Sequence, residues 1–284
     1  MLRIKYWIFI CVLLTLLFIT TFYNWKYEVI AINPFLGEGK YELKVMTWNV
    51  HCPYGADPIR QEKIAKQILK EDADIVLLNE FNLDSCMVLD SILSMYYPYK
   101  NETNAKTRGG DVFYSKIRLL DSGKFKAVHN CIYSKLFLAK DTLYVIGCHL
   151  PGNNREGQIE IDDVDSLRRV KTFWNHYRNA QEKRKDYAQF LNKTILESTL
   201  PIIVMGDMND FNASAPMDSL KDASLKNAWW EGGNGYGATF HDGWVRLRID
   251  HIYYNDKLRL EDVKVVKTDL SDHNILIADF SFAK

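Results

Sequence analysis

The sequence lacks an excess of charge of either sign, because 36 lysine and arginine residues balance 36 aspartate and glutamate residues. Nonspecific binding to nucleic acid relies on many basic contacts. A neutral chain provides no global field that attracts DNA or RNA, which argues weakly against a nuclease. The apolar and charged fractions, 47% and 25%, are those of an ordinary globular protein.

Cysteine is also scarce, since the chain has five and no two of them form a CxxC pair. The wide spacing of Cys52, Cys86, Cys131 and Cys148 predicts neither a disulfide framework nor a zinc site. Cys148 lies in an apolar run and is expected to pack as a small apolar side chain. The sequence leaves the redox state of these cysteines open.

One long uncharged run is present, from Tyr6 to Tyr23. As a helix it would be about 27 Å long, close to the thickness of the hydrocarbon core of a bilayer. Arg3 and Lys5 precede the run, so the positive-inside rule predicts an extracytoplasmic location for the rest of the chain. We therefore predict three segments: an N-terminal transmembrane helix over residues 1–23, a linker over 24–40 and one domain over 41–284.

A cleaved signal peptide is the alternative interpretation of this run. The apolar part of a signal peptide is usually shorter, about 7–15 residues, and ends in small residues at the cleavage site. The end of this run, Ile19–Tyr23, offers no such site. An uncleaved, single-pass membrane anchor is therefore favoured.

Short apolar runs with strand character alternate with helical patterns over the rest of the chain. Two runs, 76–78 and 202–205, are apolar at every position, which indicates strands that are covered on both faces. Asp57 and Pro58 are typical of the cap and first turn of a helix. The expected strands are 43–50, 74–78, 111–114, 131–138, 143–148, 202–205, 249–254, 263–266 and 275–282. This mixture predicts an α/β fold of two packed sheets with helices outside.

Polar residues follow five of the apolar runs. They are Asn49, Glu80, His149, Asp207 with Asn209, and Asp272 with His273. A single carboxylate after a strand is most often a solvated loop residue. Five such ends that converge at one edge of the sheets would instead build an acidic pocket on rigid supports.

Such a pocket suits a hard divalent cation. Carboxylate and amide oxygens are the ligands of Mg²⁺, and no His/Cys set has the spacing of a zinc site. His149 and His273 could transfer protons or stabilise charge on a phosphoryl group. Asp250 is expected to orient an imidazole by accepting a hydrogen bond from its far nitrogen.

Six motifs resemble, in their order, those of the endonuclease/exonuclease/phosphatase superfamily. This superfamily includes pancreatic-type deoxyribonucleases, abasic-site endonucleases, neutral sphingomyelinases and inositol polyphosphate 5-phosphatases. The motifs are Trp48-Asn-Val, Leu78-Asn-Glu, Cys148-His-Leu, Gly206-Asp-Met-Asn, Arg248-Ile-Asp-His-Ile and Ser271-Asp-His. Single motifs of this kind are weak, and it is the ordered set across Leu43 to Phe280 that carries the resemblance.

The resemblance implies a four-layered sandwich of two mixed β-sheets with outer helices and one active site at the sheet edges. It implies a site for Mg²⁺, with Mn²⁺ as the alternative, at Asn49, Glu80 and Asp272. The implied catalytic set is His149, Asp207 on the attacking water, Asn209 on the phosphate, and His273 held by Asp250. Asn153 is a further candidate for contact with the phosphate.

Two positions depart from the pattern of this superfamily. Its members often carry Gln before the motif glutamate, where this chain has Asn79. Some of its nucleases have a second acidic residue two positions after the motif asparagine, where this chain has His51. The second departure puts a second metal position of the nuclease type in doubt.

The sequence therefore predicts a membrane-anchored, divalent-metal-dependent phosphoesterase that hydrolyses a phosphate mono- or diester and acts as a monomer. Loops rather than the motif core decide the substrate, so the sequence leaves a lipid headgroup, a small molecule and a nucleic acid open as substrates. One alternative is an extracytoplasmic nuclease. Another is a catalytically dead membrane-tethered binding module, which would be expected to lack part of the motif set that is complete here.

Overall fold

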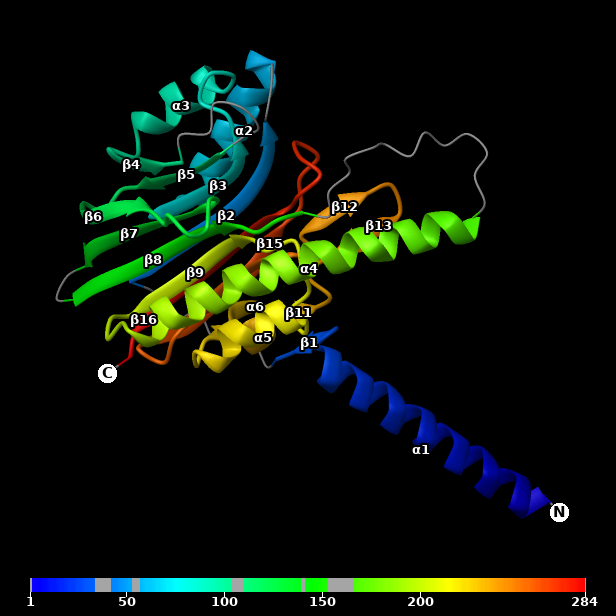
Figure 1. Ribbon diagram of the computed structural model, residues 1–284. Coiled ribbons are helices and arrows are strands. Elements are labelled where there is room, and N and C mark those ends of the chain that lie inside the picture. Colours follow the sequence, from blue (N-terminus) through cyan, green and yellow to red (C-terminus); the bar gives the residue numbers. More distant parts are fainter. Residues whose placement is uncertain are drawn as a thin grey trace.

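The computed structural model describes residues 2–33, 42–52, 57–103, 110–138, 141–152 and 166–283, and two six-stranded mixed sheets form its centre (Figure 1). The first sheet consists, in spatial order, of β15 (Leu258–Val266), β16 (Ile275–Phe282), β2 (Leu43–Cys52), β3 (Ile75–Phe81), β5 (Gly110–Ser115) and β4 (Tyr99–Glu102). The second consists of β10 (Lys226–Asn227), β14 (Asp250–Tyr254), β9 (Ile202–Asp207), β8 (Asp141–His149), β7 (Cys131–Leu138) and β6 (Leu119–Lys124). Each sheet contains one parallel pair, β2 with β3 and β8 with β9.

Helices cover the outer face of each sheet (Figure 1). The first sheet is covered by α2 (Pro58–Glu71) and α3 (Met87–Ser94), and the second by α4 (Ser166–Leu196) and α5 (Ala215–Asp222). Three clusters of buried apolar side chains fill the spaces between these layers, one between the sheets and one under each helical layer. The predicted α/β architecture of two mixed sheets with outer helices is confirmed.

Strand β3 illustrates how the sequence builds these layers. Ile75 and Leu77 belong to the cluster between the sheets, whereas Val76 and Leu78 belong to the cluster under α2 and α3. Successive side chains of a strand point to opposite faces, so a strand covered on both faces needs an unbroken apolar run. All four side chains are fully buried, and each contributes roughly 1.5–3 kcal/mol relative to exposure.

The two parallel pairs end at the same edge of the sandwich. The register places Asn49 opposite Asn79 in the first sheet and His149 opposite Asp207 in the second. Asp250, at the start of the neighbouring antiparallel strand, also lies opposite Asp207. This register brings the ends of the motif strands together across the two sheets.

The pairing of β2 with β3 is irregular at this edge. Between Asn49 and Cys52, β2 contains one residue more than the facing stretch of β3, as in a β-bulge. His51 and Glu80 lie in this stretch and both have a positive φ, 42° and 52°. Such conformations are strained for residues other than glycine and concentrate at functional sites.

At the N-terminus, helix α1 (Leu2–Tyr27) extends away from the sandwich (Figure 1). Within the ranges given above, no helix combines the length and the apolar character needed to cross a membrane, so the transmembrane helix expected over residues 1–23 is not confirmed. The following strand, β1 (Ala31–Ile32), pairs with β11 (Asn234–Gly235). The remaining elements are α6 (Ala228–Gly232), β12 (Phe240–Asp242) and β13 (Val245–Leu247).

Residues Glu28–Asn33, which we call the N-terminal arm, are bound to the domain. The guanidinium of Arg248 donates to the carbonyl oxygens of Glu28 and Val29. The Glu28 carboxylate pairs with Lys221 at 3.2 Å, and the Asn33 amide donates to two carbonyl oxygens at 2.8 and 3.0 Å. The predicted linker, 24–40, therefore contacts the domain over the arm, and its residues 34–40 lie outside the described ranges.

Two cysteines that the sequence left unassigned form a disulfide, Cys52 with Cys86. It joins the end of β2, next to the irregular stretch, to the residue before α3. Cys131 and Cys148 are free and buried. Cys148 packs in the cluster under α4 and α5, as expected of a small apolar side chain.

Candidate active site

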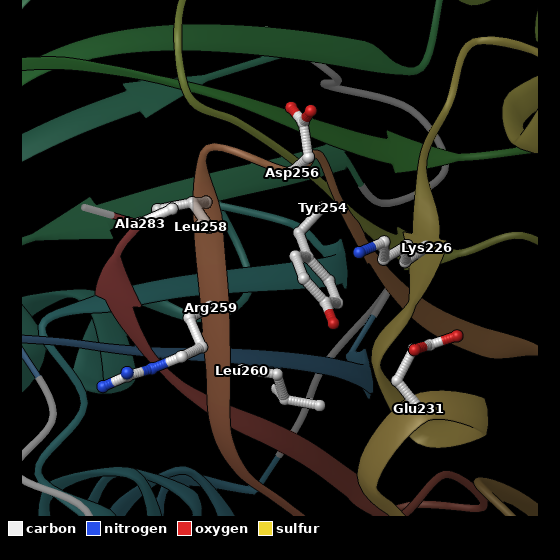
Figure 2. A pocket seen from close by; sticks show the side chains of 8 residues that line it. All are labelled: Lys226, Glu231, Tyr254, Asp256, Leu258, Arg259, Leu260 and Ala283. Carbon is white, nitrogen blue, oxygen red and sulfur yellow. The ribbon is translucent and has the colours of Figure 1, made fainter.

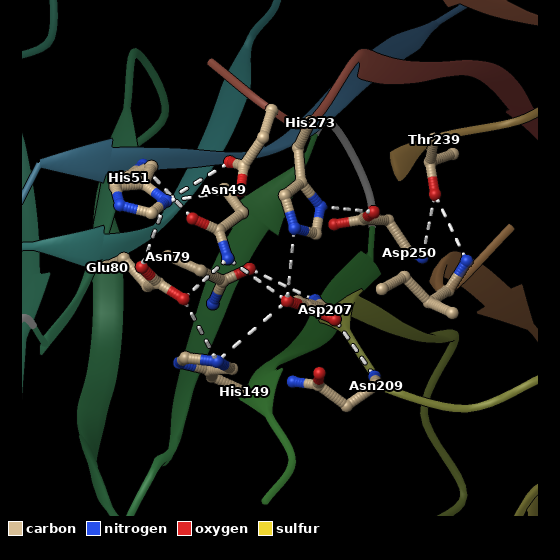
Figure 3. Close-up of polar contacts among 12 residues, drawn as sticks. Asn49, His51, Asn79, Glu80, His149, Asp207, Asn209, Thr239, Asp250 and His273 are labelled. Atoms are coloured by element: carbon tan, nitrogen blue, oxygen red, sulfur yellow. Dashed lines mark hydrogen bonds and ion pairs between the residues drawn. The ribbon is translucent and has the colours of Figure 1, made fainter. Parts of the chain in front are cut away.

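Side chains from both sheets meet at the edge where the parallel strands end (Figure 3). They fall into two groups that differ in exposure. We call Asp207, Asp250 and His273 the buried half of the site. We call His51, Glu80 and Asp272 the open half, because their side chains are 28–55% exposed.

A short contact between an imidazole and a carboxylate organises the buried half. His273 donates from Nδ1 to Asp250 Oδ2 at 2.8 Å, and its Nε2 lies 3.8 Å from Asp207 Oδ2. Burial opposes a charge on the ring, yet the carboxylates of Asp250 and Asp207 outweigh it and raise the pKa of His273 to about 10. His273 is therefore an imidazolium at neutral pH.

The backbone around this pair is fixed by buried hydrogen bonds. The Thr239 hydroxyl accepts from the backbone N–H of Ile249 at 3.1 Å and of Asp250 at 3.0 Å. The indole of Trp48 donates to the carbonyl oxygen of His273 at 2.9 Å. These contacts set the orientation of the Asp250 and His273 side chains before any substrate arrives.

Asp207 lies at the centre of the site. Its Oδ1 accepts from the backbone N–H of Asn209 at 2.9 Å, and its Oδ2 accepts from the Asn49 amide at 3.0 Å. Burial and the charge of Asp250 raise the pKa of Asp207, although two histidines oppose the rise. A carboxylate with a raised pKa is better suited to accept a proton than an ordinary aspartate.

His149 approaches Asp207 from the other side. Its Nε2 lies 3.8 Å from Asp207 Oδ2 and from Glu80 Oε1, and its Nδ1 lies 3.9 Å from Asp111 Oδ1. Burial opposes a charge on this ring, but Asp207 and Asp111 outweigh it and raise the pKa of His149. Two imidazoles therefore flank one carboxylate oxygen.

Asp111 was not among the residues expected from the sequence. It is fully buried, and burial raises its pKa to about 6 against the charge of His149 and a hydrogen bond from Asn79. Asn79 links it to the centre, because its amide donates to Asp111 at 2.7 Å and accepts from the Asp207 N–H at 3.0 Å. The available signal was one carboxylate at the start of the apolar run 111–114.

In the open half, an imidazole lies between two carboxylates. His51 Nδ1 is 3.2 Å from both oxygens of Asp272 and 3.9 Å from Glu80 Oε2. The hydrogen bond to Asp272 raises the pKa of His51. Partial burial raises the pKa of Asp272, but the His51 contact and two imidazole charges outweigh it and lower that pKa to about 2.

The residues predicted to bind metal lie at one edge but do not form one tight set. Asn49 faces Glu80 with its amide nitrogen, at 3.0 Å, and its oxygen accepts from the His51 N–H. Within the described part of the chain, two clusters place three donor atoms within 4.8 Å of one another, and neither contains Asp272. They are Glu80 with His149 and Asp207, and Asp207 with Asp250 and His273.

The donor chemistry nevertheless fits a divalent cation. Carboxylates crowd together here, and the raised pKa values of Asp207 and Asp111 reflect burial together with that excess of negative charge. An oxygen-rich, partly exposed cluster of this kind is the usual environment of Mg²⁺ and Mn²⁺. Asn209 has a positive φ of 51° and donates to the Leu150 carbonyl at 3.0 Å. Asn153 lies outside the described residues.

A separate pocket of about 470 Å³ lies elsewhere (Figure 2). Its lining includes Tyr254, the last residue of the strand that Asp250 begins, so it opens at the opposite end of β14. The other lining residues are Lys226, Glu231, Asp256, Leu258, Arg259, Leu260 and Ala283. None of the residues predicted for the active site belongs to this pocket.

The sequence model of the Endonuclease/Exonuclease/phosphatase family matches residues 46–273, which span both sheets and the whole site. The chain belongs to the endonuclease/exonuclease/phosphatase family. The resemblance inferred from six motifs is thereby confirmed. As a member of this family, the chain is a metal-dependent phosphoric ester hydrolase with a candidate metal site at the edge described above.

Among curated proteins, Protein angel from Drosophila melanogaster is 26% identical over 207 residues, which cover 66% of this chain and 56% of that protein. The chain thus spans about half the length of the curated relatives it matches, 56% and 46% of the two. The activity of the whole relative does not transfer to this chain.

Three solved structures share the fold of this family member. Humanized D. rerio TDP2 has a TM-score of 0.63 at 16% identity and covers 84% of this chain and 98% of its own. The human Nocturnin catalytic domain, with a bound sulfate anion, has a TM-score of 0.62 at 20% identity, with coverages of 86% and 94%. The Neisseria 3′ phosphatase NExo, bound to a product DNA hairpin, has a TM-score of 0.63 at 16% identity, with coverages of 84% and 100%.

Proposed function

We propose that this chain hydrolyses a phosphate mono- or diester by in-line attack of water, with Mg²⁺ or Mn²⁺ as the cation. The observation that carries the proposal is the position of Asp207 Oδ2, which lies 3.8 Å from the Nε2 atoms of both His149 and His273. A carboxylate between two imidazoles can accept the proton of a water molecule while the imidazoles face the phosphoryl oxygens.

Each side chain has a distinct task in this proposal. Asp207 orients and deprotonates the attacking water, and the Asn209 N–H keeps that carboxylate in place. His273 enters the reaction as an imidazolium and donates from Nε2 to the phosphoryl group, because Asp250 occupies its other nitrogen. His149 donates to the same group from the opposite side. Asn209 supplies a further amide at the phosphate.

The cation would be held by Glu80 and Asp272, with Asn49 beside them. When bound, a divalent cation neutralises charge that develops on the phosphoryl and leaving oxygens. The remaining steps belong to the protein side chains. Preorganised groups of this kind typically contribute about 10²–10³ in rate each.

The substrate class follows less directly. TDP2 of D. rerio has been solved with a single-strand DNA product and NExo with a DNA hairpin, so relatives of this fold act on DNA. For this chain, a nuclease is the second candidate, and the balance of 36 basic and 36 acidic residues disfavours it. We favour a lipid headgroup or a small phosphoester, with the chain acting as a monomer.

We further propose that residues 1–23 form a single-pass anchor and that the domain lies outside the cytoplasm. The uncharged run Tyr6–Tyr23 supports this. So do the large apolar side chains of α1, since Leu13, Leu17 and Phe18 are 56–69% exposed among the residues that the structure describes. The disulfide is typical of proteins in oxidising compartments.

The test uses the full-length protein in detergent micelles, with and without EDTA, on a panel of substrates. The panel contains sphingomyelin, inositol phosphates, nucleotides, RNA and plasmid DNA. We expect hydrolysis of at least one phosphoester that EDTA abolishes and added Mg²⁺ or Mn²⁺ restores. Turnover that survives EDTA, or a complete lack of turnover with specific binding, would favour a different mechanism or the binding module.

The anchor has its own test. Membranes from expressing cells are washed with alkaline carbonate, which removes peripheral proteins. We expect the full chain to remain in the membrane pellet and a protein that lacks residues 1–23 to appear in the soluble fraction. Release of the full chain by the wash would rule out a spanning helix.

A further inference from the structure

A buried ion pair links helix α4 to the loop that follows β9. Arg184 Nε donates to Asp210 Oδ2 at 2.9 Å, and both side chains are 0% exposed. Removing two charges from water is costly, and well-packed apolar side chains often stabilise a fold as well as a buried ion pair does. A role beyond stability is therefore to be sought in what this guanidinium joins.

The same guanidinium reaches the loop that follows β8. Arg184 Nη1 donates to the carbonyl oxygen of Pro151 at 2.9 Å. Pro151 lies two residues after His149, the last residue of β8. Asp210 lies three residues after Asp207, the last residue of β9. Because a guanidinium is planar and its donors point in fixed directions, one side chain can hold both loops at a set separation.

The amide of Asn209 lies between these two loops. Its side chain donates to the Leu150 carbonyl at 3.0 Å, and its backbone N–H donates to Asp207 Oδ1 at 2.9 Å (Figure 3). A Cβ atom at Gly152 would lie only 3.5 Å from Asn209 Oδ1. Asn209 also has a positive φ of 51°, and such a backbone persists only where the surrounding contacts determine it.

We propose that Arg184 is a positioning residue, which places the Asn209 amide at the phosphate by joining the two loops on either side of it. This inference rests on the proposed function, in which Asn209 contacts the phosphate. It deepens that function, because it assigns part of the preorganisation of the site to a side chain of α4. A displacement of about 1 Å in a group that binds the substrate can cost about 10²-fold in rate.

The experiment is a double-mutant cycle on the full-length protein in detergent micelles. Arg184→Lys keeps a positive charge for Asp210, but a single ammonium cannot reproduce the two directed contacts to Asp210 and Pro151. Asn209→Gly removes the amide and tolerates the positive φ. The wild type, both single variants and the double variant are compared by kcat/KM for bis(p-nitrophenyl) phosphate at saturating cation.

The expected signature is a loss that depends on Asn209. In the wild-type background, Arg184→Lys should lower kcat/KM by up to about 10²-fold. In the Asn209→Gly background it should cost no more than about 2-fold, because the group that it positions is already gone. Lys185, the exposed neighbour on the same helix, provides the matched control, since Lys185→Met should leave kcat/KM unchanged in both backgrounds.

A second variant guards against a loss of folding. Arg184→Met combined with Asp210→Asn removes both charges, so that no lone charge is left buried. Circular dichroism and a thermal melt check that it folds. It should lose kcat/KM in the wild-type background and change it little in the Asn209→Gly background, as Arg184→Lys does.

Three results would overturn the inference in different ways. Equal losses in both backgrounds, or normal kcat/KM in the Arg184 variants, would remove Arg184 as a positioning residue and leave the proposed function intact. Normal kcat/KM in Asn209→Gly would remove the inference together with the role of Asn209. A wild type without hydrolysis that EDTA abolishes would remove the proposed function itself.

Discussion

The buried half and the open half of the active site are adjacent, yet their side chains differ in exposure to solvent. The side chains of Asp207, Asp250 and His273 are 1–6% exposed. In the open half, the side chains of His51, Glu80 and Asp272 are 28–55% exposed. Burial fixes the rotamers of the first group. Exposure lets the second group exchange partners with solvent, as a site that takes up a cation must.

The electrostatic consequences follow the same division. In the buried half, an imidazolium with a pKa of about 10 lies against two carboxylates. In the open half, Asp272 has a pKa of about 2 and stays ionised at any physiological pH. We infer that the buried half carries out proton transfer and charge stabilisation, whereas the open half binds the cation.

The largest effect is expected in the buried half. His273→Ala and Asp207→Ala should each lower kcat by about 10²–10³, since each removes a group that acts on the transition state. Excess cation should not restore activity. The measurement is hydrolysis of bis(p-nitrophenyl) phosphate, with a thermal melt to verify folding. Near-normal turnover by both variants would end the assignment of the chemistry to this half.

A change in the open half should have a different signature. Glu80→Gln keeps the size of the side chain but removes its charge, so the cation concentration that gives half-maximal activity should rise about 10–100-fold. Saturating cation should restore most of kcat. A variant whose kcat stays low at saturating cation would show that Glu80 also acts in the chemical step and would blur the division between the halves.

Asp111→Asn tests how the buried half is supported. Loss of the carboxylate beside His149 should lower activity about 10-fold. Stability should change in the opposite direction. The folded-state pKa of about 6 lies above the ordinary 3.8, so the folded protein binds the proton more tightly than the unfolded one, and ionisation destabilises the fold as pH rises.

The stability advantage of Asp111→Asn should therefore be absent below pH 4, grow between pH 4 and 6, and level off above. We expect roughly 1–3 kcal/mol at pH 7, measured by urea unfolding of metal-free protein at several pH values. Asn79→Ala serves as the comparison, because it removes the hydrogen bond to Asp111 and leaves the charge. An advantage that does not vary with pH would exclude the ionisation of Asp111 as its source.

The smallest effect on activity is expected for the disulfide. Cys52→Ser with Cys86→Ser should lower the free energy of unfolding by about 2–4 kcal/mol. Because the bridge lies behind the irregular stretch, the open half should loosen slightly while the buried half keeps its geometry. Cation affinity should therefore change more than kcat at saturating cation. Calorimetry and cation titrations measure the two quantities.

Much of the fold could be predicted from the sequence, because most central strands have the apolar pattern of a covered strand. Strands 43–50, 131–138, 202–205 and 275–282 were expected within a few residues of β2, β7, β9 and β16. The edge strands β4 and β6 were missed. Their sequences, YKNE and LLDSGK, are mostly half-buried or exposed, so they lack the apolar pattern that marks a covered strand.

The same distinction applies to the active site, where local sequence patterns predict some residues and not others. The motif residues of the buried half were placed by their order along the chain, and the strand register brings them together. Asp111 and the Cys52–Cys86 bridge could not be found in this way, because each depends on a contact between strands or loops that no local pattern encodes. At His51 the sequence shows only a departure from the superfamily pattern, and the position of the ring depends on a φ that the sequence does not specify.

The N-terminal arm has a consequence for how this enzyme meets its substrate. Helix α1 ends at Tyr27, and the first bound residue of the arm is Glu28. No unbound residue therefore separates the end of the helix from the bound arm. If α1 lies in a bilayer, the domain cannot rotate freely relative to the helix. The edge of the sheets that carries the active site is then held at a fixed height and tilt above the lipid. A truncated protein should accordingly begin at Asn24 and not at Tyr41, so that Arg248 keeps the carbonyl oxygens it binds.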